Sequence, residues 1–325
     1  MSGRWGKGAG RVALALALLG GLAWWAPWRG ASAPGTAPAS PASTTEHGAV
    51  EGRGGPVPAK ASIRRTRLPP LPPAGLPLEA TAPALLARAD AGDPVAACRL
   101  GEGLLRCRDI AAWEAADAKA GTDMAESFAR SGNLRAAVAI DEQRLWRLEQ
   151  LAHCDALDEK LKTRGGEFLA RAARAGNRHA MVAYASGIHF DHRGGYAASR
   201  EFDDWRRDSP GMLQRALQAG EPSAVMLLLM AYQDDSNFAA ALIPDDPERA
   251  YAFHLLANRL FGYTVSDEYA RTLDAAAMRR ARELARQMHE RHFGGRRFDG
   301  KLAHLLPPAL QRPDGYPQDP CVPEA

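Results

Sequence analysis

Two histidine clusters are the residues in this sequence whose types and spacing come closest to a chemical site. His189, Asp191 and His192 form an H-x-D-H cluster, and His289 and His292 form an H-x-x-H pair. Either cluster could supply two imidazole ligands of the kind that bind zinc. The second cluster lacks the H-E-x-x-H spacing that places two histidines on one helix face with a base between them. Solvent-facing or helix-capping histidines are therefore the favoured interpretation, and a metal-dependent protein or enzyme is the alternative.

Other arrangements that resemble a catalytic site are weaker. His153 precedes Cys154, but neighbouring positions on a helix point in different directions, which favours a disulfide or a core position for the cysteine. Ser223 lacks the G-x-S-x-G setting of a nucleophile, and no phosphate-binding glycine loop occurs. Three pairs of acidic residues fit helix caps and turns better than a glycosidase site: Asp203-Asp204, Asp234-Asp235 and Asp245-Asp246. The sequence therefore predicts no catalytic residue, no metal ligand and no cofactor.

Composition narrows the classes of protein further. Hydrophobic residues make up 46% of the chain, which is ample for a core, whereas aromatic residues make up only 7%. This balance favours helices that pack through alanine. The 41 basic and 38 acidic residues nearly cancel, giving a net charge of +3. A nucleic-acid-binding protein would show a concentrated basic surface, so we expect no nucleic acid as a partner.

The elements that must position these side chains follow an internal repeat. Glycine followed four residues later by alanine recurs in steps of 40, 44 and 44 residues, at Gly92/Ala96, Gly132/Ala136, Gly176/Ala180 and Gly220/Ala224. At each joint one helix is predicted to end on a left-handed glycine, and the next residue, Asp93, Asn133, Asn177 or Glu221, is predicted to begin the next helix. A period of this length is typical of a helical solenoid, in which each helix pair packs on its neighbours.

The joints predict helices over 82–91 and 94–107, 113–130 and 134–151, 166–175 and 178–190, 200–219, 222–232 and 247–261. The helix over 200–219 should be interrupted at Ser209-Pro210-Gly211, because proline breaks helical hydrogen bonding. After Gly262 the pattern fails, and one long helix over 266–292 is expected to cap the array. The expected fold is therefore all-α: an α-solenoid of about four helix-turn-helix repeats with a C-terminal capping helix over residues 77–294. Residues 295–325 are expected to form a proline-rich tail on the surface.

The first 76 residues are predicted to lie outside this domain. Three basic residues precede the uncharged run Val12 to Trp28, which is typical of an export signal. As a helix, its 17 residues would span about 25 Å, short of the roughly 30 Å hydrocarbon core. A cleaved signal peptide and an uncleaved signal anchor over residues 1–28 both stay open, and the anchor is favoured. Residues 29–76, rich in alanine, proline and glycine, are predicted to be a disordered linker. The domain is then expected in the periplasm, tethered to the inner membrane or exported after cleavage.

The repeats resemble the Sel-one-like repeat family, relatives of the tetratricopeptide repeats, over roughly residues 84–262. The resemblance rests on Ala91-Gly92-Asp93, Ala175-Gly176-Asn177 and Leu100-Gly101, and on Asp246-Pro247-Glu248-Arg249-Ala250-Tyr251, which is similar to the family's opening of a second helix. The family's leucine-glycine pair occurs here only once, and the second repeat carries a long insert. The resemblance implies a non-enzymatic scaffold or adaptor that binds an unidentified protein partner through its concave face.

Four cysteines in a chain that carries an export signal predict disulfides: Cys98, Cys107, Cys154 and Cys321. Cys98 and Cys107 lie about 13 Å apart along one predicted helix, too far for a bridge. The favoured pair is Cys107–Cys154, because these residues end equivalent helices of neighbouring repeats, whose axes lie about 8–10 Å apart. Links of Cys98 or Cys321 to Cys154 remain open. Cys98 itself is interpreted as a small buried apolar residue.

Overall fold

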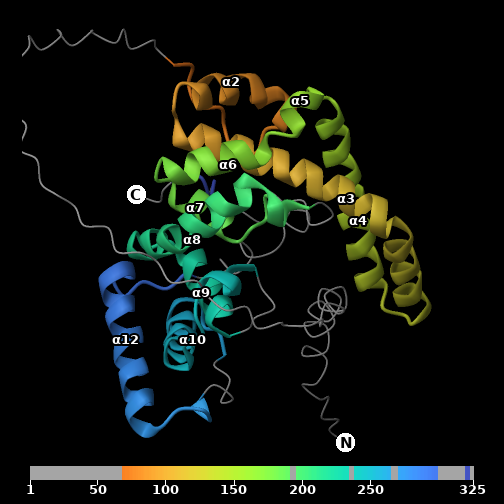
Figure 1. The fold of residues 1–325 in the computed structure, drawn as a ribbon. Coiled ribbons are helices and arrows are strands. Elements are labelled where there is room, and N and C mark those ends of the chain that lie inside the picture. The colour runs from red at the N-terminus through yellow and green to blue at the C-terminus, as the bar shows by residue number, and fades with distance from the viewer. Residues whose placement is uncertain (1–67, 191–194, 234–237, 265–269, 299–318, 323–325) are drawn as a thin grey trace, which may run out of the picture. The chain divides into compact units, whose positions relative to one another are not determined.

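The computed structural model describes residues 68–190, 195–233, 238–264, 270–298 and 319–322. Within these ranges every regular element is a helix, so the predicted all-α class is confirmed for this part of the chain (Figure 1). The predicted signal or anchor and nearly all of the predicted linker lie outside the described residues, as do Asp191 and His192. Among the described helices, none has the length and apolar character that a membrane span requires.

Successive helices pack on one another along the chain. In order they are α2 (Leu78–Asp90), α3 (Pro94–Arg130), α4 (Leu134–Asp155), α5 (Glu159–Lys162), α6 (Gly165–Arg174), α7 (Arg178–Ala185), the 3₁₀ helix η1 (Tyr196–Ala198), α8 (Arg200–Gln218), α9 (Pro222–Gln233), the 3₁₀ helix η2 (Phe238–Leu242), α10 (Pro247–Phe261) and α12 (Ala275–Phe293). Helix α3 packs against α2, α4 and α6, helix α7 against α6 and α8, and helix α10 against α9 and α12.

All four predicted joints have the expected backbone. Gly92, Gly132, Gly176 and Gly220 have φ of 91°, 79°, 96° and 75°. At the first joint the N–H of Gly92 donates to the carbonyl of Ala89, and the next N–H donates to the carbonyl five residues before it; the same pair of bonds recurs at the other three. These bonds define a Schellman C-cap, which satisfies carbonyls at the helix end. Local sequence therefore determines where these helices end.

Each joint also starts the next helix. The side chains of Asp93, Asn133 and Asn177 accept hydrogen bonds from backbone N–H groups in the first turn of the following helix. Such caps satisfy donors that have no partner within the helix. Pro94 occupies the first helical position after Asp93, where a missing N–H costs little.

Several predicted helix ends are wrong. Helix α3 is continuous over 37 residues, from Pro94 to Arg130, because the predicted break between 107 and 113 contains no glycine or proline. Helix α8 likewise continues through Pro210. One proline removes a single helical hydrogen bond, and the buried side chains of Trp205 and Leu213 on either side of it favour a continuous helix.

Two further helices are shorter than predicted. Helix α7 ends at Ala185 instead of Phe190, because Gly187 takes a left-handed φ of 76°. Helix α12 begins at Ala275 instead of Ser266, and the side chain of Asp274 caps it by accepting from the N–H of Ala277 at 2.7 Å. The end of α7 and the start of α12 are therefore set by local residues, Gly187 and Asp274, that the predicted boundaries did not take into account.

A close approach of two backbones fixes α6 on the N-terminal half of α3. A Cβ atom on Gly101 would lie 2.7 Å from the backbone nitrogen of Leu169, and one on Gly165 would lie 3.0 Å from Cγ of Leu105. Only glycine allows helices to approach this closely. Because α7 follows α6 through the joint at Gly176, this contact also determines where α7 lies relative to α3.

Candidate functional site

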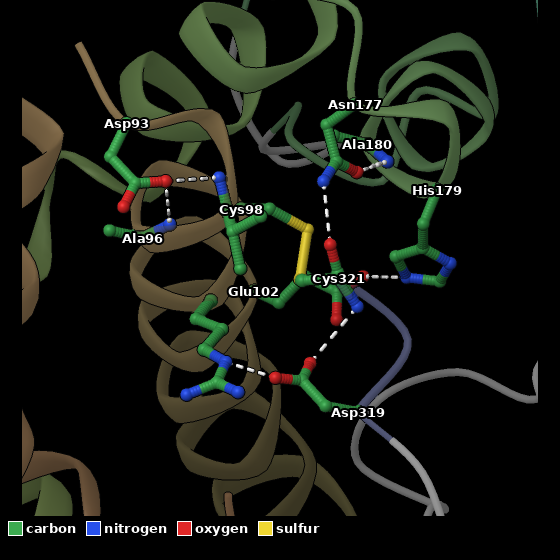
Figure 2. The surroundings of a disulfide bond; sticks show 11 residues. Asp93, Ala96, Cys98, Glu102, Asn177, His179, Ala180, Asp319 and Cys321 are labelled. Atoms are coloured by element: carbon green, nitrogen blue, oxygen red, sulfur yellow. Dashed lines mark hydrogen bonds and ion pairs between the residues drawn. A yellow bond between two sulfur atoms is a disulfide. The ribbon is translucent and has the colours of Figure 1, made fainter. Parts of the chain in front are cut away.

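The C-terminal residues 319–322 lie against α3 and α7, and this junction is the candidate functional site (Figure 2). Cys321 forms a disulfide with Cys98 of α3, with an S–S distance of 2.03 Å and a Cα–Cα distance of 5.7 Å. Both cysteines are buried, at 0% and 2% exposure. The interpretation of Cys98 as an unpaired apolar residue is therefore wrong. The described part of the tail is anchored in the core at Cys321, whereas Val322 next to it is 41% exposed.

Asn177 binds the tail and caps α7 at the same time. Its Oδ1 accepts from the N–H of Ala180 at 2.9 Å, and its Nδ2 donates to the carbonyl of Cys321 at 2.8 Å (Figure 2). An aspartate such as Asp93, which caps α3 at the first joint, has the acceptor but not the donor. The amide of Asn177 can therefore cap α7 and donate to the tail at the same time, whereas a carboxylate at this position could only cap the helix.

Arg99 holds two segments that are far apart in sequence. It forms an ion pair with Asp319 of the tail, and its Nη1 donates to the carbonyl of Pro72 at 2.5 Å, in the segment before α2. The side chains of Arg99 and Asp319 are mostly buried, at 15% and 11% exposure. Asp319 also accepts from the N–H of Cys321 at 3.0 Å through Oδ1, a turn that shapes the tail.

His179 and Glu102 form an ion pair between α7 and α3 beside the tail (Figure 2). The distance from Nε2 to Oε1 is 2.5 Å, and the two side chains are 12% and 19% exposed. Burial of the imidazole opposes its protonation, but Glu102, assisted by Glu221 and Asp319, raises the pKa of His179 to about 9. A histidine with this pKa is protonated at neutral pH. It therefore lacks the lone pair that a general base or a metal ligand needs.

Glu221 and Ser223 extend this polar cluster at the start of α9. Oε1 of Glu221 accepts from Oγ of Ser223 at 2.6 Å and from its N–H at 3.3 Å, and Oε2 of Glu221 lies 3.7 Å from Nε of Arg178. The carboxylate of Glu221 thus accepts from both the backbone N–H and the hydroxyl of Ser223 in the first turn of α9.

The second disulfide joins the hairpin of α3 and α4. Cys107 and Cys154, the pair favoured from the sequence, have an S–S distance of 1.98 Å and a Cα–Cα distance of 5.6 Å. The neighbouring His153 lies 2.6 Å from Glu79 of α2, measured from Nδ1 to Oε1. The imidazole of His153 therefore connects α4 with α2. The sulfur of the adjacent Cys154 is part of the disulfide with Cys107.

Of the two histidine clusters, the structure describes His189, His289 and His292, whereas Asp191 and His192 lie outside the described residues. The ring of His189 stacks on Tyr184 with centroids 4.6 Å apart, and Nε2 of His289 donates to the carbonyl of Arg296 at 3.0 Å. Burial, with a further effect of Arg291, lowers the pKa of His292. Among the described residues, no group of three or more His, Cys, Asp or Glu side chains is placed to hold a metal ion.

Sequence reasoning missed most residues of the site: Arg99, Glu102, His179 and Asp319 were not singled out, and Asn177 was seen only as a helix cap.

Comparison with known proteins adds no relative, since no family model matches the chain and neither a curated protein nor a solved structure matches it significantly.

Proposed function

We propose that this protein is a non-enzymatic scaffold or adaptor of a bacterial-type cell envelope. In this proposal the helices form an α-solenoid of about four helix-turn-helix repeats related to the Sel-one-like family, with α12 as its cap and a partner protein bound on its concave face. The four joints with the same C-cap and the packing of each helix on its neighbours support the repeat architecture.

The observation that carries the proposal is the binding of residues 319–322 by the helices. A short non-helical segment is held by a hydrogen bond from the side-chain amide of Asn177 to the backbone carbonyl of Cys321, and by an ion pair between Arg99 and Asp319. Main-chain hydrogen bonds contribute affinity when proteins bind extended peptides, and complementary charges contribute specificity. The pairing of His179 with Glu102 favours a structural role for this histidine.

A peptide-binding experiment tests whether the helices can bind the tail segment as a separate peptide. The receptor is the chain ended after residue 312 with Cys98→Ser, and the ligand is a labelled peptide of residues 313–325 with Cys321→Ser. We expect binding with a Kd of about 10 µM to 1 mM, weakened about tenfold in a receptor that also carries Arg99→Glu. Circular dichroism must show both receptors folded. A folded receptor that does not bind the peptide at millimolar concentration contradicts the proposal.

The proposed location has its own support and its own test. Two disulfides favour an oxidising compartment, in agreement with an export signal at residues 1–28. A periplasm-active reporter fused after residue 325 is expected to be active, because the basic flank should keep the N-terminus inside. Activity only of a reporter that works in the cytoplasm would overturn the location.

A further inference from the structure

Helix α4 carries two apolar stripes, and only one of them is covered by the described residues. The inner stripe, which includes Ala137 and Cys154, is buried against α3. The second, here called the outer stripe, consists of Leu134, Val138, Leu145 and Leu148, which are 64%, 53%, 67% and 43% exposed. Together with Asp141, the outer stripe follows the alternating steps of four and three residues that mark one seam of a coiled coil.

The angle between the stripes fits a helix with two neighbours. At 100° per residue the outer stripe lies about 110° around the axis of α4 from the inner stripe. Each helix of a four-helix bundle contacts two neighbours at about a right angle to each other. Among the described helices α3 supplies one such neighbour along α4, and α2 contacts α4 more weakly, with His153 near the end of α4 paired to Glu79. Figure 1 shows α3 and α4 side by side, with the end of α3 and the start of α4 beyond α5 and α6. The outer stripe therefore lies on the face of α4 where a second neighbouring helix would pack in a four-helix bundle.

We propose that a second copy of this chain covers the outer stripe, with the two α4 helices antiparallel about a two-fold axis close to Asp141. The stripe is nearly symmetric about this residue: Leu134 and Leu148 lie seven positions away on either side, and Val138 and Leu145 lie three and four positions away. Antiparallel pairing thus brings leucine onto leucine and valine onto leucine. A self-complementary patch is what a two-fold interface requires.

Charges beside the stripe favour the same pairing. An axis near Asp141 places Arg135 of each copy beside Glu149 of the other, which gives two opposite-charge pairs at the edge of the interface. The axis also brings the two carboxylates of Asp141 together, and their repulsion weakens the dimer. The opposite-charge pairs of Arg135 with Glu149 act against this repulsion, which agrees with a weak dimer.

The size of the stripe predicts a weak dimer. It extends for about 21 Å, and half the circumference of a helix about 10 Å across gives roughly 300–450 Å² per copy. The total is below the approximately 1,000 Å² expected of a stable specific interface. Association through α4 alone is therefore expected to depend strongly on protein concentration.

Cysteine cross-linking of the full chain tests the axis. All four native cysteines are in disulfides, so Asp141→Cys introduces a single new thiol. Under mild oxidation we expect a dimer that is lost on reduction. The matched control is Ala139→Cys, an exposed position on the far side of α4, which should stay monomeric. Equal cross-linking of both variants, no cross-linking of Asp141→Cys, or its cross-linking mainly to a different protein would overturn the proposal.

Mass measurement with charge reversal tests the partner contacts. By light scattering, Leu145→Glu should raise the dimer Kd about tenfold or more without lowering the thermal midpoint. Met230→Glu, which alters a 39% exposed side chain on α9, should leave the Kd unchanged. Arg135→Glu and Glu149→Arg should each weaken the dimer, and the double variant should restore it. A full chain that is monomeric at all concentrations, or a double variant weaker than either single one, would refute the pairing.

Discussion

The ion pair of His179 with Glu102 makes the stability of the domain depend on pH in a defined direction. Contact with Glu102 raises the pKa of His179 from its ordinary 6.5 to about 9 in the folded protein, even though burial opposes the charge. The folded state therefore binds the proton more tightly than the unfolded chain. The resulting stabilisation is present in full below about pH 6.5 and disappears as the pH rises through 9. A difference of about 2.5 between the folded and unfolded pKa values corresponds to at most roughly 3–4 kcal/mol.

The assay is urea unfolding of the oxidised protein at several pH values between 6 and 10, for the native chain and for His179→Gln. Glutamine keeps a hydrogen-bond donor toward Glu102 but carries no charge. The variant should be less stable by about 2–3 kcal/mol at pH 6, and the difference should approach zero near pH 10. Glu102→Gln should reduce the pH dependence in the same way, and the two changes should be non-additive. A difference between the native chain and His179→Gln that is the same at every pH would refute the reasoning.

Two further predictions use matched pairs of positions and the same unfolding measurement. Asn177→Asp keeps the cap of α7 but loses the donor to Cys321, so it should cost about 1–3 kcal/mol, whereas Asn133→Asp, at an exposed cap that makes no such bond, should change stability by less than about 0.5 kcal/mol. Equal losses would show that the amide does not hold the tail. Gly101→Ala should cost about 1–3 kcal/mol, because its Cβ would lie 2.7 Å from backbone, whereas Gly121→Ala, with nothing within 4 Å, should stabilise α3 by up to about 1 kcal/mol. A neutral Gly101→Ala would mean that α3 and α6 can separate easily.

The sequence predicts the joints well because the information is local. A left-handed glycine and the capping residue after it act within about six residues, and all four joints are found where the repeat places them. Helix interruptions are predicted less well, as Pro210 shows, because burial on both sides of a proline outweighs one lost hydrogen bond. Whether a helix continues through a proline depends on the packing of side chains around it, and a single stretch of sequence does not contain this information.

The candidate site was not predictable because its residues come from three distant segments. Arg99 and Glu102 belong to α3, His179 to α7 and Asp319 to the tail, and nothing near them in the sequence marks the pairing. From the sequence, a link of Cys98 to Cys154 stayed open and a buried unpaired position was favoured, so its link to Cys321 was not singled out. The sequence did contain one signal. The third joint has Asn177 where the first joint has Asp93, and the asparagine side chain has an N–H donor that aspartate lacks.

The bond between Cys98 and Cys321 has a consequence for how the domain unfolds. Arrays in which each helix pair contacts only its neighbours can fray from either end, because an outer repeat opens without disturbing the others. Here a covalent link spans 223 positions, and Arg99 joins the same helix to both Pro72 and Asp319. The first and last described segments therefore meet on α3, and the chain between the two cysteines is a closed ring. The bond limits how far helices within this ring can separate, so we expect more cooperative unfolding while it is intact than after it is reduced.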